Sequence, residues 1–175
     1  KKYLLPIGNK YFFDLLIERL SSFNINHIYI SLHYEADKFI DYLNKTLDQD
    51  YFTAIIEPKP LGTGGAIKYV IENSTISSDF AVINSDTLSE IDLDKMFISF
   101  DSSVYPSYIG ISKVKDCERY GSVIVENGKV VSFLEKGNKG SSWINNGHYI
   151  FNKDQFIDYD NPFSLEKKLL PQLVN

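Results

Sequence analysis

Two patterns in the 175-residue sequence predict an α/β fold with a β-rich second lobe. Before about residue 100, strand-like apolar runs alternate with helical spacing of apolar residues, which is typical of βαβ units and a mostly parallel sheet. After that point, short strand-like segments follow one another and include the hairpin dipeptide Asn127-Gly128. Because no low-complexity linker separates the two parts, we expect one domain over 1–175, with lobes of about 1–100 and 101–175.

The elements of the first lobe follow from the spacing of its apolar residues. Helical spacing predicts helices over about 11–22 and 35–46, and a third helix that begins near Ala66. Pro58 and Pro60 end the strand before that third helix, because proline cannot donate to a central ladder. The predicted strands are the apolar runs at about 27–32, 51–56 and 80–84.

The second lobe begins with a short helical pattern near 93–100 and continues mainly as strands. The turn at Asn127-Gly128 joins two of these strands and favours antiparallel pairing. Helical spacing returns near 156–157 and 165–173. The predicted strands cover about 107–114, 121–126, 129–135 and 143–151.

Composition and charge argue against several classes of protein. With 23 acidic and 18 basic residues, the chain has a formal charge of −5, which disfavours nucleic acid as the main partner. No apolar run approaches the roughly 20 residues of a membrane-spanning helix. The single cysteine, Cys117, forbids an internal disulfide and fits a cytoplasmic protein. The chain starts at Lys1 without a methionine and stops after a helical pattern, so we expect further native segments at both ends.

The glycine-rich stretch Leu61–Ala66 is the first candidate binding element. Glycines at 62, 64 and 65 allow positive φ or let a flat ligand approach the backbone closely. Amide groups at the start of the following helix favour anions or the polar edge of a base. A plain strand-to-helix turn has the same pattern, because short glycine motifs are weak indicators by themselves.

Asp86 is the second candidate, because it is a carboxylate directly after an apolar strand. A carboxylate in this position is either a helix N-cap or a ligand for Mg²⁺, which prefers one or two carboxylates together with phosphate oxygens. Lys136 and Lys2 have a similar ambiguity. Each is either a point charge for a phosphate group or a solvated surface lysine.

Six short motifs follow one another along nearly the whole chain. They are Lys2-Tyr3-Leu4-Leu5-Pro6-Ile7, Glu57-x-x-Pro60-Leu61-Gly62-Thr63-Gly64-Gly65-Ala66, Asn84-Ser85-Asp86-Thr87, Arg119-Tyr120-Gly121, Phe133-Leu134-Glu135-Lys136 and Ile144-Asn145-Asn146-Gly147-His148-Tyr149. In order and spacing these motifs together resemble the sugar-1-phosphate nucleotidyltransferases, and most closely the bacterial D-glycero-D-manno-heptose 1-phosphate guanylyltransferases and their mannose-1-phosphate relatives.

The resemblance implies a three-layer, Rossmann-like mixed sheet of the nucleotide-diphospho-sugar transferase type. It also implies transfer of a nucleotidyl group from an NTP, with GTP favoured, to a heptose or mannose type of sugar 1-phosphate, with Mg²⁺ as cofactor. Residues before about 100 would bind the nucleotide, and later ones the sugar. The implied nucleotide-binding residues are Glu57, Leu61, Gly62 and Thr63; the catalytic residues are Lys2, Asp86 and Lys136, with Asp86 on the metal; the sugar-binding residues are Gly121, Glu135, Asn146 and Gly147.

Departures from the family pattern keep other functions open. A loop of the type Gly-Gly-x-Gly-Thr-Arg is expected before Lys2, and a second metal-binding aspartate after residue 175. Ser85 stands where glycine is usual, and Asn146 where a small residue or threonine is commoner. The alternatives are a non-catalytic regulatory subunit that binds nucleotide sugars and an enzyme that uses UTP or dTTP. A glycosyltransferase is disfavoured because Ser85-Asp86-Thr87 lacks an Asp-x-Asp motif. Relatives are often dimers or tetramers, so a homo-oligomer is also an open expectation.

Overall fold

The computed structural model describes residues 4–134, 137 and 140–174, which form two compact units. One unit consists of Ile25–Ser78 and Lys153–Leu169. The other consists of Lys1–Asn24, Asp79–Asn152 and Leu170–Asn175. Among the described residues, no helix is long and apolar enough to cross a membrane.

The unit of Ile25–Ser78 and Lys153–Leu169, which we call the β3–β4 unit, is built on a parallel strand pair. Its strands align Ile28 with Phe52 at one end and Leu32 with Ile56 at the other. The helix between the strands forms the crossover that parallel pairing requires, as predicted. The elements are β3 (Ile28–Leu32), α2 (Ala36–Thr46), β4 (Phe52–Ile56), α3 (Gly62–Glu72), η2 (Lys153–Phe156) and η3 (Leu165–Leu169).

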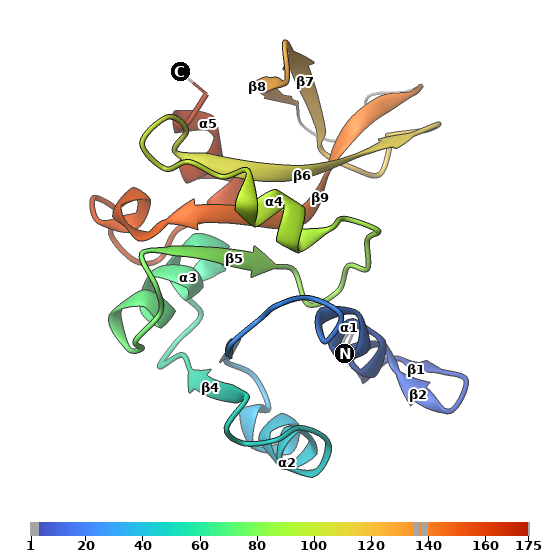
Figure 1. The fold of residues 1–175 in the computed structure, drawn as a ribbon, viewed down its shortest axis with the longest axis vertical. Helices are drawn as coiled ribbons and strands as arrows, with labels where there is room; N and C mark the ends of the chain where they lie inside the picture. Colours follow the sequence, from blue (N-terminus) through green and yellow to red (C-terminus); the bar gives the residue numbers. More distant parts are fainter. Residues whose placement is uncertain (1–3, 135–136, 138–139, 175) are drawn as a thin grey trace. The chain divides into compact units, whose positions relative to one another are not determined.

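The other unit, which we call the β9 unit, is built around one long strand. Figure 1 shows β9 (Ser142–Asn152) between β5 (Asp79–Ile83) and β6 (Ser107–Val114), and both pair with it antiparallel. Tyr149, Ile150 and Phe151 of β9 have no exposed surface, so this strand lies in the core. The remaining elements are β1 (Pro6–Ile7), β2 (Lys10–Tyr11), α1 (Phe12–Leu20), α4 (Leu93–Ile98), β7 (Ser122–Glu126), β8 (Lys129–Leu134) and α5 (Leu170–Gln172).

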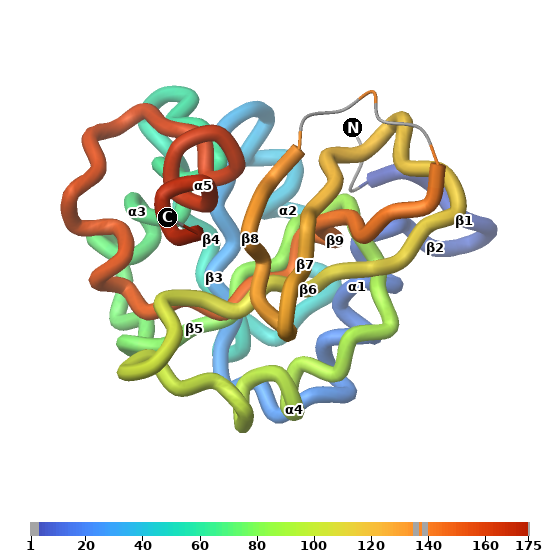
Figure 2. Tube along the Cα trace, turned by 90° about the horizontal axis from the view of Figure 1, so that it is seen from above, coloured from blue at the N-terminus to red at the C-terminus, as the bar shows by residue number. Residues whose placement is uncertain are grey.

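The predicted hairpin and most predicted elements are confirmed. β7 and β8 pair antiparallel through a turn in which Asn127 has φ +50° and Gly128 φ +76°, and the hairpin can be followed in Figure 2. The positive φ angles explain why this dipeptide suits the turn. The two short strands β1 and β2 had not been predicted, because two residues each give too short a pattern.

The pairing of β5 differs from the sequence-based expectation. Alternating helices and strands led us to expect β5 in a mostly parallel sheet, but it pairs antiparallel with β9. Among the described residues, parallel pairing is confined to β3 and β4. Hydrophobic periodicity reports how buried a strand is and not which strand lies beside it. Parallel and antiparallel pairing both occur, so the prediction of a mixed α/β fold is confirmed.

Candidate functional site

Glu57 organises the loop in which the nucleotide-binding residues were predicted. It follows β4, and its amide donates to the carbonyl of Leu32 (2.7 Å). Its Oε1 accepts a hydrogen bond from Ser31 Oγ (2.8 Å), and its Oε2 accepts one from the amide of Leu61 (3.1 Å). One carboxylate therefore joins β3, the end of β4 and the residue before α3. In this arrangement Glu57 fixes the path of the chain into the glycine-rich stretch.

The glycine-rich stretch is the first turn of α3, which begins at Gly62 rather than near Ala66. The amides of Gly64 and Gly65 both donate to the carbonyl oxygen of Phe163 (3.1 Å each), and the amide of Phe163 donates to Leu61 O (2.9 Å). The sequence left open whether the amides at the start of this helix face a ligand or belong to a plain turn. At Gly64 and Gly65 the plain turn is what the structure has, because a carbonyl of the same chain accepts hydrogen bonds from both amides.

Each of the three glycines faces the segment around Phe163. Gly62 has φ +76°, and a Cβ there would lie 2.5 Å from Phe163 O. A Cβ on Gly64 would overlap the Phe163 ring, and one on Gly65 would lie 2.6 Å from Asn161 Oδ1. The predicted need for glycine is therefore confirmed, but its structural cause at these positions is close packing within the chain.

Thr63 is bonded to the same part of the chain through its side chain. Its Oγ1 donates to Glu166 Oε2 (2.7 Å) and accepts a hydrogen bond from the amide of Leu165 (2.9 Å). Ser164 Oγ donates to the same carboxylate oxygen (3.0 Å). The sequence analysis did not identify Ser164 or Glu166. Ser164 directly precedes the predicted helical pattern at 165–173 and Glu166 lies in its first turn, which resembles an ordinary helix start.

Asp86 lies in the β9 unit, in an exposed turn directly after β5. The amide of Thr87 closes this turn by donating to Asn84 O (3.2 Å). No helix starts here: the next helix, α4, has Asp92 as its N-cap, which accepts a hydrogen bond from the amide of Lys95 (3.1 Å). That bond holds the pKa of Asp92 below its ordinary value. The helix N-cap interpretation of Asp86 is therefore excluded, and the interpretation as a Mg²⁺ ligand stays a prediction.

Within the described residues, Asp86 is not part of a cluster of metal-binding side chains. Among residues 4–134, 137 and 140–174, no three His, Cys, Asp or Glu side chains form a group that could hold a metal. Mg²⁺ does not need such a cage, since it commonly keeps water and takes phosphate oxygens beside one or two carboxylates. An exposed carboxylate on a closed turn fits that chemistry.

Gly147 packs directly against the Asp86 turn. Its carbonyl accepts a hydrogen bond from the amide of Asn84 (2.9 Å), and its amide donates to Asn145 Oδ1 (2.9 Å). Gly147 has φ +76°, and a Cβ there would lie 2.6 Å from Asn84 Nδ2. The neighbouring Asn146 is buried, and its Nδ2 donates to Ser112 Oγ (3.1 Å). The structure therefore brings two predicted sugar-binding residues beside the turn that carries Asp86.

Of the remaining predicted site residues, only Gly121 lies in the part of the chain that the structure describes. Gly121 immediately precedes β7, whose first residue, Ser122, pairs with Ile144 of β9, so Gly121 adjoins the sheet that contains Asn146 and Gly147. Lys2, Glu135 and Lys136 lie outside the described residues. Glu57, Leu61, Gly62 and Thr63 are in the β3–β4 unit, whereas Asp86, Gly121, Asn146 and Gly147 are in the β9 unit. The functional roles of all these residues stay predictions.

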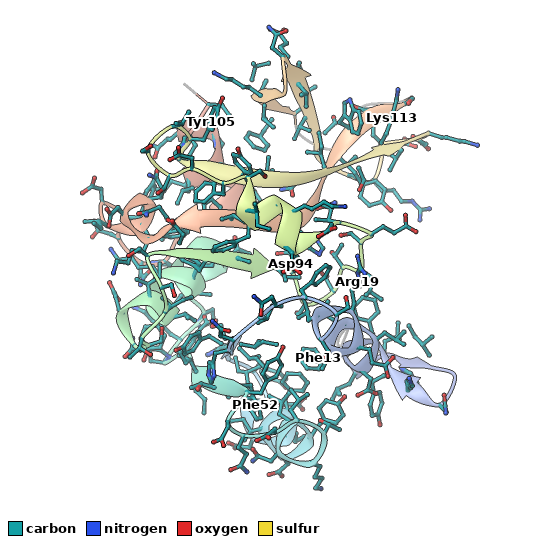
Figure 3. All side chains as sticks on the ribbon, in the orientation of Figure 1. Phe13, Arg19, Phe52, Asp94, Tyr105 and Lys113 are labelled. Atoms are coloured by element: carbon teal, nitrogen blue, oxygen red, sulfur yellow. The ribbon has the colours of Figure 1, made fainter. Side chains whose placement is uncertain are left out.

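His148 is a buried titratable group next to Gly147, and only 4% of its surface is exposed. Burial lowers the pKa of its imidazole, and the charge of Arg19 lowers it further. Figure 3 shows Arg19 near Asp94; its Nη2 donates to Ile91 O (3.0 Å), which keeps the guanidinium in this region. The imidazole Nε2 lies 3.3 Å from Ser89 Oγ. Burial of His148 therefore favours the neutral imidazole over the charged one.

Gly147→Ala should destabilise the protein more than Gly128→Ala, although both glycines have φ +76°. The positive φ costs an alanine about 1–2 kcal/mol at either position. A Cβ at Gly128 meets nothing within 4 Å, whereas at Gly147 it displaces Asn84. We expect that displacement to add about 1–2 kcal/mol, as overpacking does. Chemical denaturation gives the free energy of unfolding of both variants. An equal loss of this free energy in the two would contradict the packing account.

His148→Gln should make stability less sensitive to acid. Burial lowers the pKa of folded His148 from its ordinary value of 6.5, so the unfolded chain binds the proton more readily. The neutral ring contributes stability above about pH 6.5, and this contribution is lost as the pH falls through the folded-state pKa. Urea titrations between about pH 7 and pH 5 should show a steeper loss in the wild type than in the variant. His33→Gln, which replaces an exposed histidine, is the matched control for the substitution itself.

Comparison with known proteins identifies the family. The family described as Nucleotidyl transferase matches residues 1–169. The chain is 34% identical over 174 residues to the D-glycero-alpha-D-manno-heptose 1-phosphate guanylyltransferase of Aneurinibacillus thermoaerophilus, covering 97% of this chain and 74% of that protein. It is 29% identical to a putative mannose-1-phosphate guanyltransferase of Sulfolobus acidocaldarius, covering 99% of this chain and 48% of that protein. The chain thus spans about half of the second relative.

Solved structures give the same result. HddC from Yersinia pseudotuberculosis, complexed with GMP-PN, superposes with a TM-score of 0.86 at 38% identity over 98% of this chain and 76% of that chain. The inositol-1-phosphate CTP transferase of T. maritima has a TM-score of 0.74 at 16% identity over 99% of this chain and 72% of that chain, which shows the fold alone. The predicted nucleotidyltransferase fold is confirmed, and the chain belongs to the nucleotidyl transferase family.

Proposed function

We propose that this protein transfers a guanylyl group from GTP to a sugar 1-phosphate of the heptose or mannose type, giving a GDP-sugar and pyrophosphate. One observation carries the proposal. The heptose 1-phosphate guanylyltransferases of A. thermoaerophilus and Campylobacter jejuni are 34% and 33% identical to this chain over 97% and 96% of its length. The 38% identity to a protein solved with GMP-PN supports guanine as the base.

The geometry of the β3–β4 unit supports a base-binding role for the first turn of α3. Glu57 bonds the amide of Leu61, and Leu61 is buried, so the residues that follow are held in place. Gly62 and Thr63 are exposed on this supported turn. We infer that the edge of the base meets their backbone, while Glu57 acts as a positioning residue.

The reaction needs positioning and charge stabilisation more than a protein nucleophile. An oxygen of the sugar phosphate forms a bond to the α-phosphorus of GTP, and the bond from that phosphorus to the pyrophosphate oxygen breaks. Asp86 would hold Mg²⁺, which supplies positive charge to the phosphate oxygens when bound. Lys2 and Lys136 would contact phosphates, and Gly121, Glu135, Asn146 and Gly147 the sugar, as the family resemblance implies. These substrates fit a cytoplasmic enzyme.

A pyrophosphate-release screen tests the proposed reaction. Four NTPs would each be paired with mannose, glucose and heptose 1-phosphates in the complete protein with Mg²⁺. We expect GTP with a heptose or mannose 1-phosphate to give the highest kcat/KM. A preference for UTP or dTTP would contradict the proposed base. Binding of nucleotide sugar without turnover of any pair would instead support the regulatory-subunit alternative.

Asp86→Asn tests the metal site. The amide keeps the shape of the side chain but removes the charge, so we expect kcat/KM to fall about 100-fold or more. The Mg²⁺ concentration for half-maximal rate should rise as well. Glu90→Gln removes another exposed carboxylate four residues later in the same loop and should leave both quantities unchanged. An Asp86→Asn enzyme with the wild-type Mg²⁺ dependence would remove Asp86 from the metal site.

A further inference from the structure

One short segment, Asn161–Glu166, supports the whole glycine-rich turn of α3. We propose that this segment positions the turn for the nucleotide, and that Thr63 and Glu166 are positioning residues of the site through their mutual hydrogen bond. The proposal rests on the proposed function only in taking Gly62 and Thr63 as the place where the nucleotide binds. It assigns to Thr63 a role other than direct contact through its hydroxyl.

The backbone of Phe163 forms the first part of the support. Its carbonyl accepts from two successive amides, Gly64 and Gly65, and its amide donates to Leu61 O. Its ring, 6% exposed, lies against Gly64 and stacks on Tyr159 with centroids 4.8 Å apart and planes 19° apart. Three backbone hydrogen bonds and a buried ring thus hold one end of α3. The turn cannot shift without breaking them.

The side chains of Thr63 and Glu166 form the second part. Thr63 Oγ1 and Ser164 Oγ both donate to Glu166 Oε2, at 2.7 and 3.0 Å. Ser164 Oγ is itself fixed by a hydrogen bond from the amide of Lys167 (3.2 Å). A carboxylate oxygen suits this arrangement because it accepts from two donors at once and strengthens both bonds.

The hydrogen bonds of Thr63 decide which of its atoms can meet a ligand. Its only hydroxyl proton points to Glu166, and one lone pair of the oxygen receives the amide of Leu165. The hydroxyl therefore has no proton left to donate to a nucleotide. Thr63 can still present its backbone, and the orientation of that backbone depends on the bond to Glu166. Loss of the bond should weaken nucleotide binding and leave binding of the sugar phosphate unchanged.

Four variants of the complete protein test this inference. Thr63→Val removes the hydroxyl at nearly constant shape, Thr63→Ser keeps it, Glu166→Ala removes the acceptor, and the fourth variant combines Thr63→Val with Glu166→Ala. The control is Glu72→Ala, which removes a half-exposed carboxylate at the other end of α3, 3.8 Å from Lys68 Nζ. Calorimetry gives the Kd for GTP, steady-state kinetics give the KM for each substrate, and thermal melting gives Tm.

We expect Thr63→Val and Glu166→Ala each to raise the Kd for GTP about 5- to 10-fold, which is the size of effect that the loss of one ordinary intramolecular hydrogen bond has. The KM for the sugar 1-phosphate should stay within about twofold. Thr63→Ser should restore wild-type binding, and the double variant should be no weaker than Thr63→Val, because both changes remove the same bond.

Several results would overturn the inference. They are a Kd for GTP that matches the Glu72→Ala control, an equal rise in KM for both substrates, multiplicative effects in the double variant, or a lower Tm with unchanged Kd. A wild-type protein that binds GTP without turnover would refute the proposed reaction, while the Kd comparison would still decide the role of Thr63 and Glu166. A wild-type protein that binds no NTP would overturn both.

Discussion

Close packing against a glycine, with no room for a Cβ, is the constraint on which both candidate regions depend. At Gly62 the carbonyl of Phe163 occupies the space that a side chain would need, and at Gly147 the side chain of Asn84 does so. Both glycines have φ +76°, a backbone angle that residues with a side chain rarely adopt. Gly62 begins the turn at the start of α3, and Gly147 packs against the turn that carries Asp86. In each unit, therefore, one glycine decides the path of the chain beside the predicted functional residues.

The sequence predicted elements well where burial alone decides them. The helical spacing of Phe39 and Leu43, both buried, predicted α2, and Asn127-Gly128 predicted the β7–β8 hairpin. The antiparallel pairing of β5 was not predictable in this way, because its partner β9 lies more than 60 residues later in the chain. Local patterns describe the environment of a strand and carry no information about a distant neighbour.

Among the candidate site residues, too, those in a local motif could be predicted and those that depend on distant contacts could not. Glu57, Leu61, Gly62 and Asp86 were identified because their motifs are local. The structure then showed that Glu57 bonds Ser31 and that Gly62 packs against Phe163, both of which are distant in the sequence. Asp86 has no helix to cap, and its role as a metal ligand stays a prediction. Ser164 and Glu166 were missed because only the fold brings them to Thr63, about 100 positions away. Supporting residues of this kind have no motif of their own.

The hydrogen bonds at the start of α3 also bear on which end of a nucleotide it suits. A free helix N-terminus attracts phosphate through unpaired amides and the positive end of the helix dipole. Here the carbonyl of Phe163 takes the amides of Gly64 and Gly65, and the carboxylate of Glu166 lies 2.7 Å from Thr63 Oγ1. Both groups place negative charge at this helix end and oppose a phosphate there. In the proposed reaction a neutral base, recognised by the backbone of Gly62 and Thr63, avoids that repulsion. The charge of the phosphates would then be met elsewhere, by the proposed Mg²⁺ at Asp86.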